Sequence, residues 1–346
     1  MITTLAIDVM GGDGGAAVVV KGASLALEKS VNHKLAFIFF GHQPKILEEL
    51  QKFPNLAACS SVVHSDIIVT NDMKPAVAVR AGRKSNMGMA INAVAMGQAD
   101  AVISAGNTGA YMALSKIILK TLPGIDRPAI PALMPTMKGK AVVLDVGANI
   151  ECNTDNLIQF ALMGEALACQ ILNLESPSVG LLNVGSEELK GNATIQEAYQ
   201  FLRTLSDFRF SGFVEGDDIT AGKTDVIVTD GFSGNVALKA IEGAARLIKS
   251  IITHSLSSSW LGRLGYLIGR SQFKKLQAQL DPRLYNGAVF LGLRHIAVKS
   301  HGGVDAIGFA NSIDVAIQMV HKNLVHKIEQ RLNLMNARIA LESRRA

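Results

Sequence analysis

A lysine in a glycine-rich turn is the most informative chemical group in the sequence. In the segment NVGSEELKGNAT (183–194), an apolar run ends at Val184, Gly185 turns the chain, and Lys190 precedes Gly191 and Asn192. An ammonium group beside flexible backbone can bind phosphate or stabilise a developing oxyanion. A surface lysine in an ordinary turn explains the same residues equally well, so both interpretations stand.

A second polar cluster, TDGFSGN (229–235), follows another apolar run and opens a helical pattern. Asp230, Ser233 and Asn235 lie there beside the free N–H groups of the expected helix N-terminus. The Asn235 carboxamide could donate a hydrogen bond to a carbonyl or phosphate oxygen. Asparagine also caps helices well, so capping is the alternative.

The segment RAGRKSNM (80–87) places Arg83, Lys84 and Ser85 just before an expected helix. These side chains could form an anion clamp. They could equally be ordinary capping with a basic first turn.

No cofactor or metal motif accompanies these groups. The segment MGGDGGA (10–16) lacks the dinucleotide fingerprint, and no P-loop motif occurs in the chain. The eight histidines are scattered, and His321 and His326 would point about 140° apart on a helix. Cys152 would need a nearby base to act as a nucleophile, so we interpret it as a buried structural thiol. We expect neither a cofactor nor a metal.

Six apolar runs, each followed by Gly, Asn or Asp and then by a helical pattern, repeat along the chain. They lie at 5–15, 35–42, 100–110, 140–149, 178–188 and 224–235. Continuous apolar runs predict strands covered on both faces, as in a parallel sheet with helices on either side. We predict a doubly wound, mostly parallel α/β fold whose polar turns share one sheet edge. Six such turns facing one crevice favour a phosphate-sized anion, although any single turn could be only a turn.

The last third of the chain changes to longer helices without a break that resembles a linker. We therefore predict one domain over residues 1–346 with a helical subregion at about 240–285. A strand is expected at 288–300 and a terminal helix from about 305 to 341.

Charge is unevenly distributed along the sequence. Residues 239–346 hold 16 Lys and Arg against 6 Asp and Glu, whereas residues 1–238 hold 18 against 23. A basic last third points to an acidic partner or an anionic surface, with solvated helices as the alternative. No nucleic-acid motif accompanies the charge, so nucleic acid is not an expected partner. The N-terminus lacks a basic segment followed by an apolar one, and three cysteines without C-x-x-C spacing fit a reduced compartment, so we expect a cytoplasmic protein.

One stretch of the basic region is amphipathic. On a helical wheel, its large apolar residues fall within about 120°, with Arg263 and Arg270 beside them; they are Trp260, Leu261, Leu264, Leu267 and Ile268. Such a stripe could lie on a membrane surface, or it could be core or a dimer interface.

The order of these motifs resembles a known family. The segments IDVMGGD, GRKSNMGMA, DAVISAGNTGAYMA, LDVGANIEC, QFALMG, VGLLNVGSEELKGN, FVEGDDI, TDVIVTDGFSGNVALK, YNGAVFLGL and KSHGG are similar, in order, to those of phosphate acyltransferases of bacterial phospholipid synthesis. The match runs from residue 5 to about 320. One departure is that Gly14 and Gly15 stand where the family usually has His-Ala. Another is Asn86, where a second serine is common.

The resemblance implies a Rossmann-like fold of the isocitrate or isopropylmalate dehydrogenase type. It also implies transfer of a fatty acyl group from acyl carrier protein to inorganic phosphate, giving acyl phosphate for phosphatidic acid and phospholipid synthesis. The catalytic residues would be Lys190 and Asn235, which would stabilise the oxyanion. The expected phosphate or substrate contacts are Asp8, Gly11, Gly12, Lys84, Ser85, Ser104, Gly106, Asn107, Thr108, Gly109, Asn149, Gly191, Asn192, Asp230, Ser233 and His301.

The implied partners are acyl carrier protein, inorganic phosphate and a second copy of the chain. Because the carrier is acidic, four basic side chains are candidate contacts: Arg246, Lys249, Lys274 and Lys275. A long-chain product destined for a membrane glycerol-3-phosphate acyltransferase strengthens the membrane interpretation of 260–268, which would place a cytoplasmic protein at the inner face of the cell membrane.

Three alternatives remain open on the sequence. The first is a phosphotransacetylase that uses a short-chain acyl-CoA. The second is a noncatalytic anion-binding or carrier-binding scaffold, in which the polar turns only hold shape. The third and most remote is a dehydrogenase, which the missing dinucleotide fingerprint disfavours.

Overall fold

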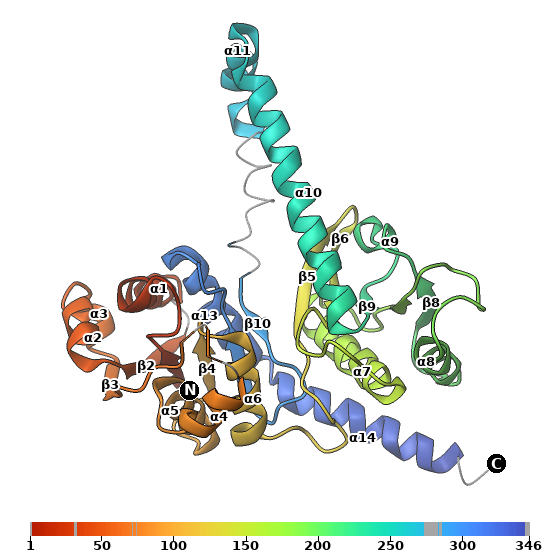
Figure 1. Cartoon of the computed structure of the whole chain (residues 1–346), viewed down its shortest axis with the longest axis horizontal. Coiled ribbons are helices and arrows are strands. Elements are labelled where there is room, and N and C mark those ends of the chain that lie inside the picture. Colours follow the sequence, from red (N-terminus) through yellow and green to blue (C-terminus); the bar gives the residue numbers. More distant parts are fainter. Residues whose placement is uncertain are drawn as a thin grey trace.

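The strands form two sheets, each covered by helices, in adjoining halves of the molecule (Figure 1). This computed structural model describes residues 2–30, 33–70, 72–73, 75–272, 283 and 286–342. The α/β fold predicted from the apolar runs is confirmed, because both sheets are mostly parallel and carry helices on their faces.

The first sheet contains the N-terminal strands and receives two strands from near the C-terminus. Its order is β10-β11-β4-β1-β2-β3, and all neighbours are parallel except β10 and β11. The strands are β1 (Ile2–Asp8), β2 (Lys34–Gly41), β3 (Ser60–His64), β4 (Ala101–Ser104), β10 (Ala288–Val289) and β11 (Ile296–Lys299). The helices of this half are α1 (Gly15–Lys29), α2 (Gln43–Leu50), α3 (Pro54–Ala57), α4 (Pro75–Gly82), α5 (Asn86–Ala95), α6 (Thr108–Leu119) and α13 (Ala306–His321).

Residues of β1 show why its sequence is apolar without alternation. Leu5 and Ile7 pack into one hydrophobic cluster together with residues of α1 and α13. Ala6, between them, points to the opposite face and packs with residues of α5 and α6. Because successive side chains on a strand point to opposite faces, burial of all three requires cover on both sides of the sheet.

The second sheet contains the middle of the chain in the order β5-β6-β9-β7-β8, with β5 and β6 antiparallel and the others parallel. Its strands are β5 (Pro131–Thr136), β6 (Gly139–Leu144), β7 (Val179–Leu182), β8 (Phe210–Val214) and β9 (Val226–Val228). The helices that follow these strands or pack on them are α7 (Thr154–Ile171), α8 (Ala193–Arg203), α9 (Asp218–Ala221), α10 (Gly231–Ser257) and α14 (Leu324–Glu342).

The division into two sheets corrects the expectation of a single sheet edge. Three of the predicted junctions follow β1, β2 and β4, and the other three follow β6, β7 and β9. The predicted polar turns therefore gather at two edges. The apolar runs could not reveal this, because buried strands look alike in either sheet.

The predicted helical subregion is an arm. Helix α10 projects from the second half and carries α11 (Trp260–Ile268) at its far end (Figure 1). Part of the predicted subregion, including Lys274 and Lys275, lies outside the described residues. In the described part of the chain, none of the helices has the length and apolar character that a membrane crossing requires.

The predicted terminal helix is two helices rather than one. Helix α13 ends at His321 and α14 begins at Leu324, and Asn323 between them has a φ of 53°. Asparagine tolerates this left-handed conformation better than most residues, so the chain turns there. The expected strand at 288–300 is likewise two short antiparallel strands, β10 and β11.

Candidate functional site

A buried carboxylate organises the edge of the first sheet. Asp8 ends β1 and is fully buried; its Oδ2 accepts a hydrogen bond from Ser104 Oγ at 2.6 Å, and its Oδ1 accepts one from Asn86 Nδ2. Burial raises the pKa of Asp8 to about 6, against the lowering effects of its hydrogen bonds and of the Lys299 charge. Both oxygens of Asp8 are thus used to join β1 to β4 and α5.

The glycines beside Asp8 are required by close approach. A Cβ on Gly11 would lie 2.6 Å from Asp8 Oδ2, and one on Gly106 would lie 2.7 Å from Met87 Cε. A Cβ on Gly12 would lie 2.9 Å from Ala105 Cβ. These glycines therefore let the loops after β1 and β4 pack against each other.

The loops after β1 and β4 also flank the point where the strand order reverses. The chain passes from β1 to β2 on one side and later places β4 on the other. Ligands of open α/β sheets bind at the carboxyl ends of strands beside such a point. Three predicted residues begin or precede helix α6 here: Asn107 caps it by accepting a hydrogen bond from Ala110 N at 3.0 Å, and Thr108 and Gly109 form its exposed first turn.

Of the other predicted contacts in this half, Ser85 lies in the interior, whereas Lys84 and His301 lie on the surface. Ser85 is buried and caps α5 by accepting a hydrogen bond from Gly88 N at 3.1 Å, whereas Lys84 is exposed. His301 is exposed, and its backbone N–H donates to Asn286 Oδ1 at 2.9 Å. The capping interpretation of Ser85 is confirmed, while an anion contact by Lys84 stays a prediction.

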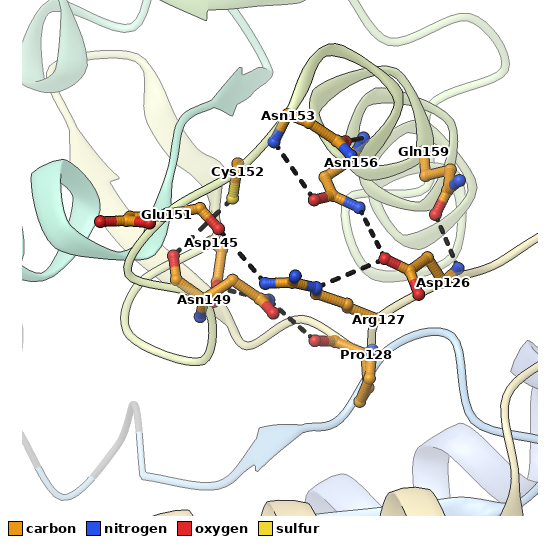
Figure 2. Close-up of polar contacts among 10 residues, drawn as sticks. All are labelled: Asp126, Arg127, Pro128, Asp145, Asn149, Glu151, Cys152, Asn153, Asn156 and Gln159. Atoms are coloured by element: carbon orange, nitrogen blue, oxygen red, sulfur yellow. Dashed lines mark hydrogen bonds and ion pairs between the residues drawn. The ribbon is translucent and has the colours of Figure 1, made fainter.

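A second buried carboxylate, Asp145, follows β6 at the edge of the second sheet (Figure 2). Its Oδ1 accepts hydrogen bonds from the backbone N–H groups of Ile130 at 2.9 Å and Ala148 at 3.1 Å. Its Oδ2 accepts from Asn149 N at 2.7 Å and Asn149 Nδ2 at 2.9 Å. Burial is the largest effect on the pKa of Asp145 and raises it.

The carboxamide of Asn149 uses both of its N–H bonds within the protein. One donates to Asp145 Oδ2 at 2.9 Å and the other to Pro128 O at 2.9 Å (Figure 2). The backbone carbonyl of Asn149 accepts a hydrogen bond from Gly231 N at 2.6 Å. The loop after β6 is thereby fastened to the start of α10. The predicted phosphate contact of Asn149 receives no support, because its donors are already engaged within the protein.

Cys152 lies in the same loop, half-buried, with its Sγ 3.7 Å from Asn149 O. Burial raises the pKa of the thiol to about 12, and the nearby Asp145 and Asp230 charges add to the effect. The thiol is therefore protonated at neutral pH and is a poor nucleophile, as expected for a structural cysteine.

The two predicted catalytic residues lie in the segments that follow two neighbouring strands. Asn235 is in the first turns of α10, which follows β9, and Lys190 is in the loop after β7. Strands β7 and β9 pair in parallel, with Leu181 opposite Val228, so both segments leave the same sheet edge. Both side chains are exposed and accessible to a substrate.

The local structure presents each of these two side chains. Asp230 caps α10 by accepting hydrogen bonds from Ser233 N at 2.8 Å and Ser233 Oγ at 2.9 Å, so the capping role falls to Asp230 rather than Asn235. A Cβ built on Gly147 would lie 3.8 Å from Asn235 Cγ, which places that carboxamide beside the loop after β6.

The loop that carries Lys190 ends in two of the predicted residues. Gly191 has a φ of 95°, a conformation that favours glycine, and Asn192 caps α8 by accepting a hydrogen bond from Ile195 N at 2.9 Å. The contacts of both residues therefore serve the loop, and their predicted substrate contacts stay predictions.

The amphipathic residues 260–268 form α11. Their side chains are largely exposed, from Leu264 at 48% to Ile268 at 80%, with Trp260 at 73%. The interpretation of this stripe as core of the chain is therefore wrong. The interpretations of the stripe as a membrane contact or a dimer interface stay predictions.

Sequence reasoning assigned no role to three polar residues of these edges: Asn86, Asp145 and Lys299. Asp145 carried a usable signal, because LDVGAN repeats the pattern of IDVMGG around Asp8. Lys299 lies opposite Ser104 in the sheet, and burial lowers its pKa to about 8 although Asp8 and Asp13 act against this shift. The described residues contain no group of three or more His, Cys, Asp and Glu arranged to hold a metal ion.

Solved structures with the same architecture are phosphotransacetylases and related α/β enzymes. A phosphotransacetylase from Streptococcus pyogenes superposes with a TM-score of 0.60 at 19% identity, covering 93% of this chain and 94% of that one. A putative 4-hydroxythreonine-4-phosphate dehydrogenase from Salmonella typhimurium gives 0.53 at 14% identity, covering 92% of this chain and 99% of that one. At these identities the likeness defines the fold class: a Rossmann-type α/β enzyme fold.

Sequence comparisons define the family. The family described as "Fatty acid synthesis protein" matches residues 3–327. A protein named phosphate acyltransferase from Rhodospirillum centenum is 52% identical over 340 residues, 98% of this chain and 95% of that protein. Another of that name from Bradyrhizobium diazoefficiens is 49% identical, over 95% of this chain and 94% of that protein. The chain belongs to the fatty acid synthesis protein family, and it is an acyltransferase.

Proposed function

We propose that the chain is a phosphate acyltransferase that transfers a fatty acyl group from acyl carrier protein to inorganic phosphate. The reaction releases acyl phosphate and the free carrier thiol, and the acyl phosphate feeds phospholipid synthesis. The names of relatives that match nearly the whole chain support the reaction, and the family description supports a fatty acyl substrate.

The chemistry needs positioning and charge stabilisation more than a strong base. A phosphate oxygen attacks the thioester carbonyl and forms a C–O bond; the tetrahedral oxyanion then collapses, the C–S bond breaks, and the carrier leaves as a thiolate that takes up a proton. Phosphate is itself a competent nucleophile near neutral pH, so no covalent acyl-enzyme is needed. The high pKa of the Cys152 thiol agrees with direct transfer.

The observation that carries this proposal is the placement of Lys190 in the loop after β7 and of Asn235 in the first turns of α10, which follows the neighbouring strand β9. An ammonium and a carboxamide presented from one sheet edge can both donate to an oxyanion formed from the thioester carbonyl. Asn235 also lies near the N-terminus of α10, a helix of 27 residues whose dipole favours negative charge at that end.

In this proposal the loops of the first sheet help to cradle the phosphate through the exposed first turn of α6. Asp8 acts indirectly, because a buried carboxylate with both oxygens occupied orients Ser104 and Asn86 rather than contacting an anion. An ionised carboxylate beside a phosphate would repel it.

The basic arm is the proposed contact for the acidic carrier. Arg246 and Lys249 lie on the exposed length of α10. Arg246 lies 3.9 Å from Glu242 in an exposed ion pair, which is weak and can be exchanged for a partner carboxylate. Lys274 and Lys275 keep the same expected role outside the described residues.

Helix α11 is the proposed contact with a membrane surface, where a long acyl chain and its product would be handed on. Helix α10 also exposes apolar side chains, since Leu247, Ile248 and Ile251 are 53–61% exposed. We assign the α10 residues to contact with a second copy in a homodimer and the α11 residues to the membrane. In this proposal the protein is cytoplasmic and meets the inner face of the cell membrane at this tip.

The direct test is phosphate-dependent release of free carrier thiol from palmitoyl-acyl carrier protein by the purified protein. We expect thiol and acyl phosphate to form in equal amounts, and omission of phosphate to stop both. A preference for acetyl-CoA over the acyl carrier substrate would instead identify a phosphotransacetylase. Stoichiometric carrier binding without thiol release would identify a scaffold.

A further inference from the structure

The loop after β7 carries Lys190 on a segment with little packing of its own. Val184 is 83% exposed and Leu189 is 90% exposed, so apolar burial does not fix the position of the loop. Its backbone turns through a hydrogen bond from Lys190 N to Glu187 O at 3.0 Å. The direction of the Lys190 side chain must therefore depend on polar contacts to the loop.

Asn183, the residue that follows β7, makes the central contacts of this kind. Its Nδ2 donates one hydrogen bond to Gly185 O and another to Lys190 O, each at 3.1 Å. One amide group thus joins carbonyls five residues apart and closes the loop. Asn183 is itself anchored, because it is 8% exposed and its backbone N–H donates to Val214 O of β8 at 2.8 Å.

Two glycines allow the loop to close in this way, because they have no side chain. A Cβ on Gly185 would lie 3.1 Å from Lys190 Cγ, so the lysine stem rests on the backbone there. A Cβ on Gly191 would lie 2.5 Å from Asn183 Oδ1, at a backbone φ of 95°. Gly191 therefore allows the chain to pass close to the Asn183 carboxamide immediately after Lys190.

The carboxamide orientation is fixed by these two bonds. Among the described residues, Asn183 Oδ1 is buried without a hydrogen-bond partner, which costs free energy unless the Nδ2 contacts outweigh it. Within the described residues, the Asn183 side chain therefore acts through its donor group.

We propose that Asn183 is a positioning residue that fixes the Lys190 ammonium for catalysis by clamping both ends of its loop. This inference rests on the proposed catalytic role of Lys190. It assigns Asn183 no contact with the substrate, so its effect on turnover passes through Lys190.

The test is a double-mutant cycle measured by thiol release from palmitoyl-acyl carrier protein at saturating phosphate. Asn183→Ala should lower kcat roughly 10- to 100-fold, because small displacements of a catalytic group are costly. In a Lys190→Ala background the same change should lower kcat less than about 2-fold. The matched control is Tyr199→Phe, which removes a 3.0 Å hydrogen bond to Glu188 of the same loop and should change kcat less than about 3-fold.

The outcomes separate the inference from the function on which it rests. An equal loss from Asn183→Ala in both backgrounds would show a general structural role and overturn the inference, while Lys190 remained catalytic. Full turnover by Lys190→Ala would overturn the catalytic assignment and the inference together. If Asn183→Ala does not fold, the same cycle with Asn183→Asp applies, since that side chain has nearly the same size but its carboxylate cannot donate.

Discussion

Replacement of Arg331 by methionine should destabilise the protein substantially, because Arg331 is the partner of a buried carboxylate. Its guanidinium on α14 donates to Glu165 of α7 through two hydrogen bonds, of 2.6 Å and 2.8 Å. The Glu165 side chain is 7% exposed and that of Arg331 is 25% exposed. Without the arginine, Glu165 would remain a buried charge with its main partner removed.

The magnitude follows from this burial. Removal of one partner from a buried ion pair costs about 3–5 kcal/mol, and the partial exposure of Arg331 places this pair near about 3 kcal/mol. For a chain of this size the melting temperature should fall by roughly 6 °C, at about 2 °C per kcal/mol. The matched control is Arg203→Met, which breaks an ion pair to Glu188 whose side chains are 49% and 63% exposed and should cost less than about 1 kcal/mol.

The assay is thermal and urea unfolding of wild type, Arg331→Met, Arg203→Met and the double variant Glu165→Gln with Arg331→Met. Burial already raises the pKa of Glu165, and loss of Arg331 should raise it further. A carboxyl whose pKa is raised in the folded state makes the protein less stable as pH rises. The stability difference between wild type and Arg331→Met should therefore be smaller at acidic pH. The double variant should recover part of the stability. A deficit no larger than that of Arg203→Met would refute the reasoning.

Four further predictions concern function and pH. Lys190→Ala and Asn235→Ala should each lower kcat roughly 10²-fold with the fold intact by circular dichroism, and near-normal turnover would refute these roles. The KM for acyl carrier protein should rise with salt in steady-state assays, and salt independence would contradict the basic arm as its contact. Trp260→Glu should abolish liposome flotation while gel filtration still shows a dimer; retained flotation would contradict membrane contact. Since burial raises the pKa of Asp8 to about 6, wild type should lose stability relative to Asp8→Asn as pH rises from 4 to 7 in urea titrations, and parallel curves would contradict this.

The sequence predicted those strands that are buried on both faces. β4 and β9 are fully buried, β1 and β6 are buried over their last four residues, and each was visible as a continuous apolar run. β3 and β8 were missed because they are partly exposed, and SSVVH and FSGFV have no strong apolar period. β5 was missed because a proline occupies its first position and another lies within it.

Sequence could place polar residues at strand ends but could not tell which of their atoms were free. Asp8 and Asn149 were expected to contact the anion, yet their polar atoms largely bind the protein itself. That distinction depends on contacts across 78 and 96 residues for Asp8, which no local pattern encodes. Lys190 and Asn235 were selected by resemblance to the family, and their catalytic roles stay predictions.

The hydrogen bonds that Asp145 accepts limit which donors are available to a ligand. The amides of Ile130, Ala148 and Asn149 point inward at its carboxylate, and an N–H that serves a buried acid cannot also serve a ligand outside. The turn after β6 therefore connects β6 to the start of α10 and has few backbone N–H groups available to a ligand. Ligand recognition at this edge of the second sheet then depends on side chains rather than on backbone N–H groups. Single substitutions should therefore be able to change the ligand specificity.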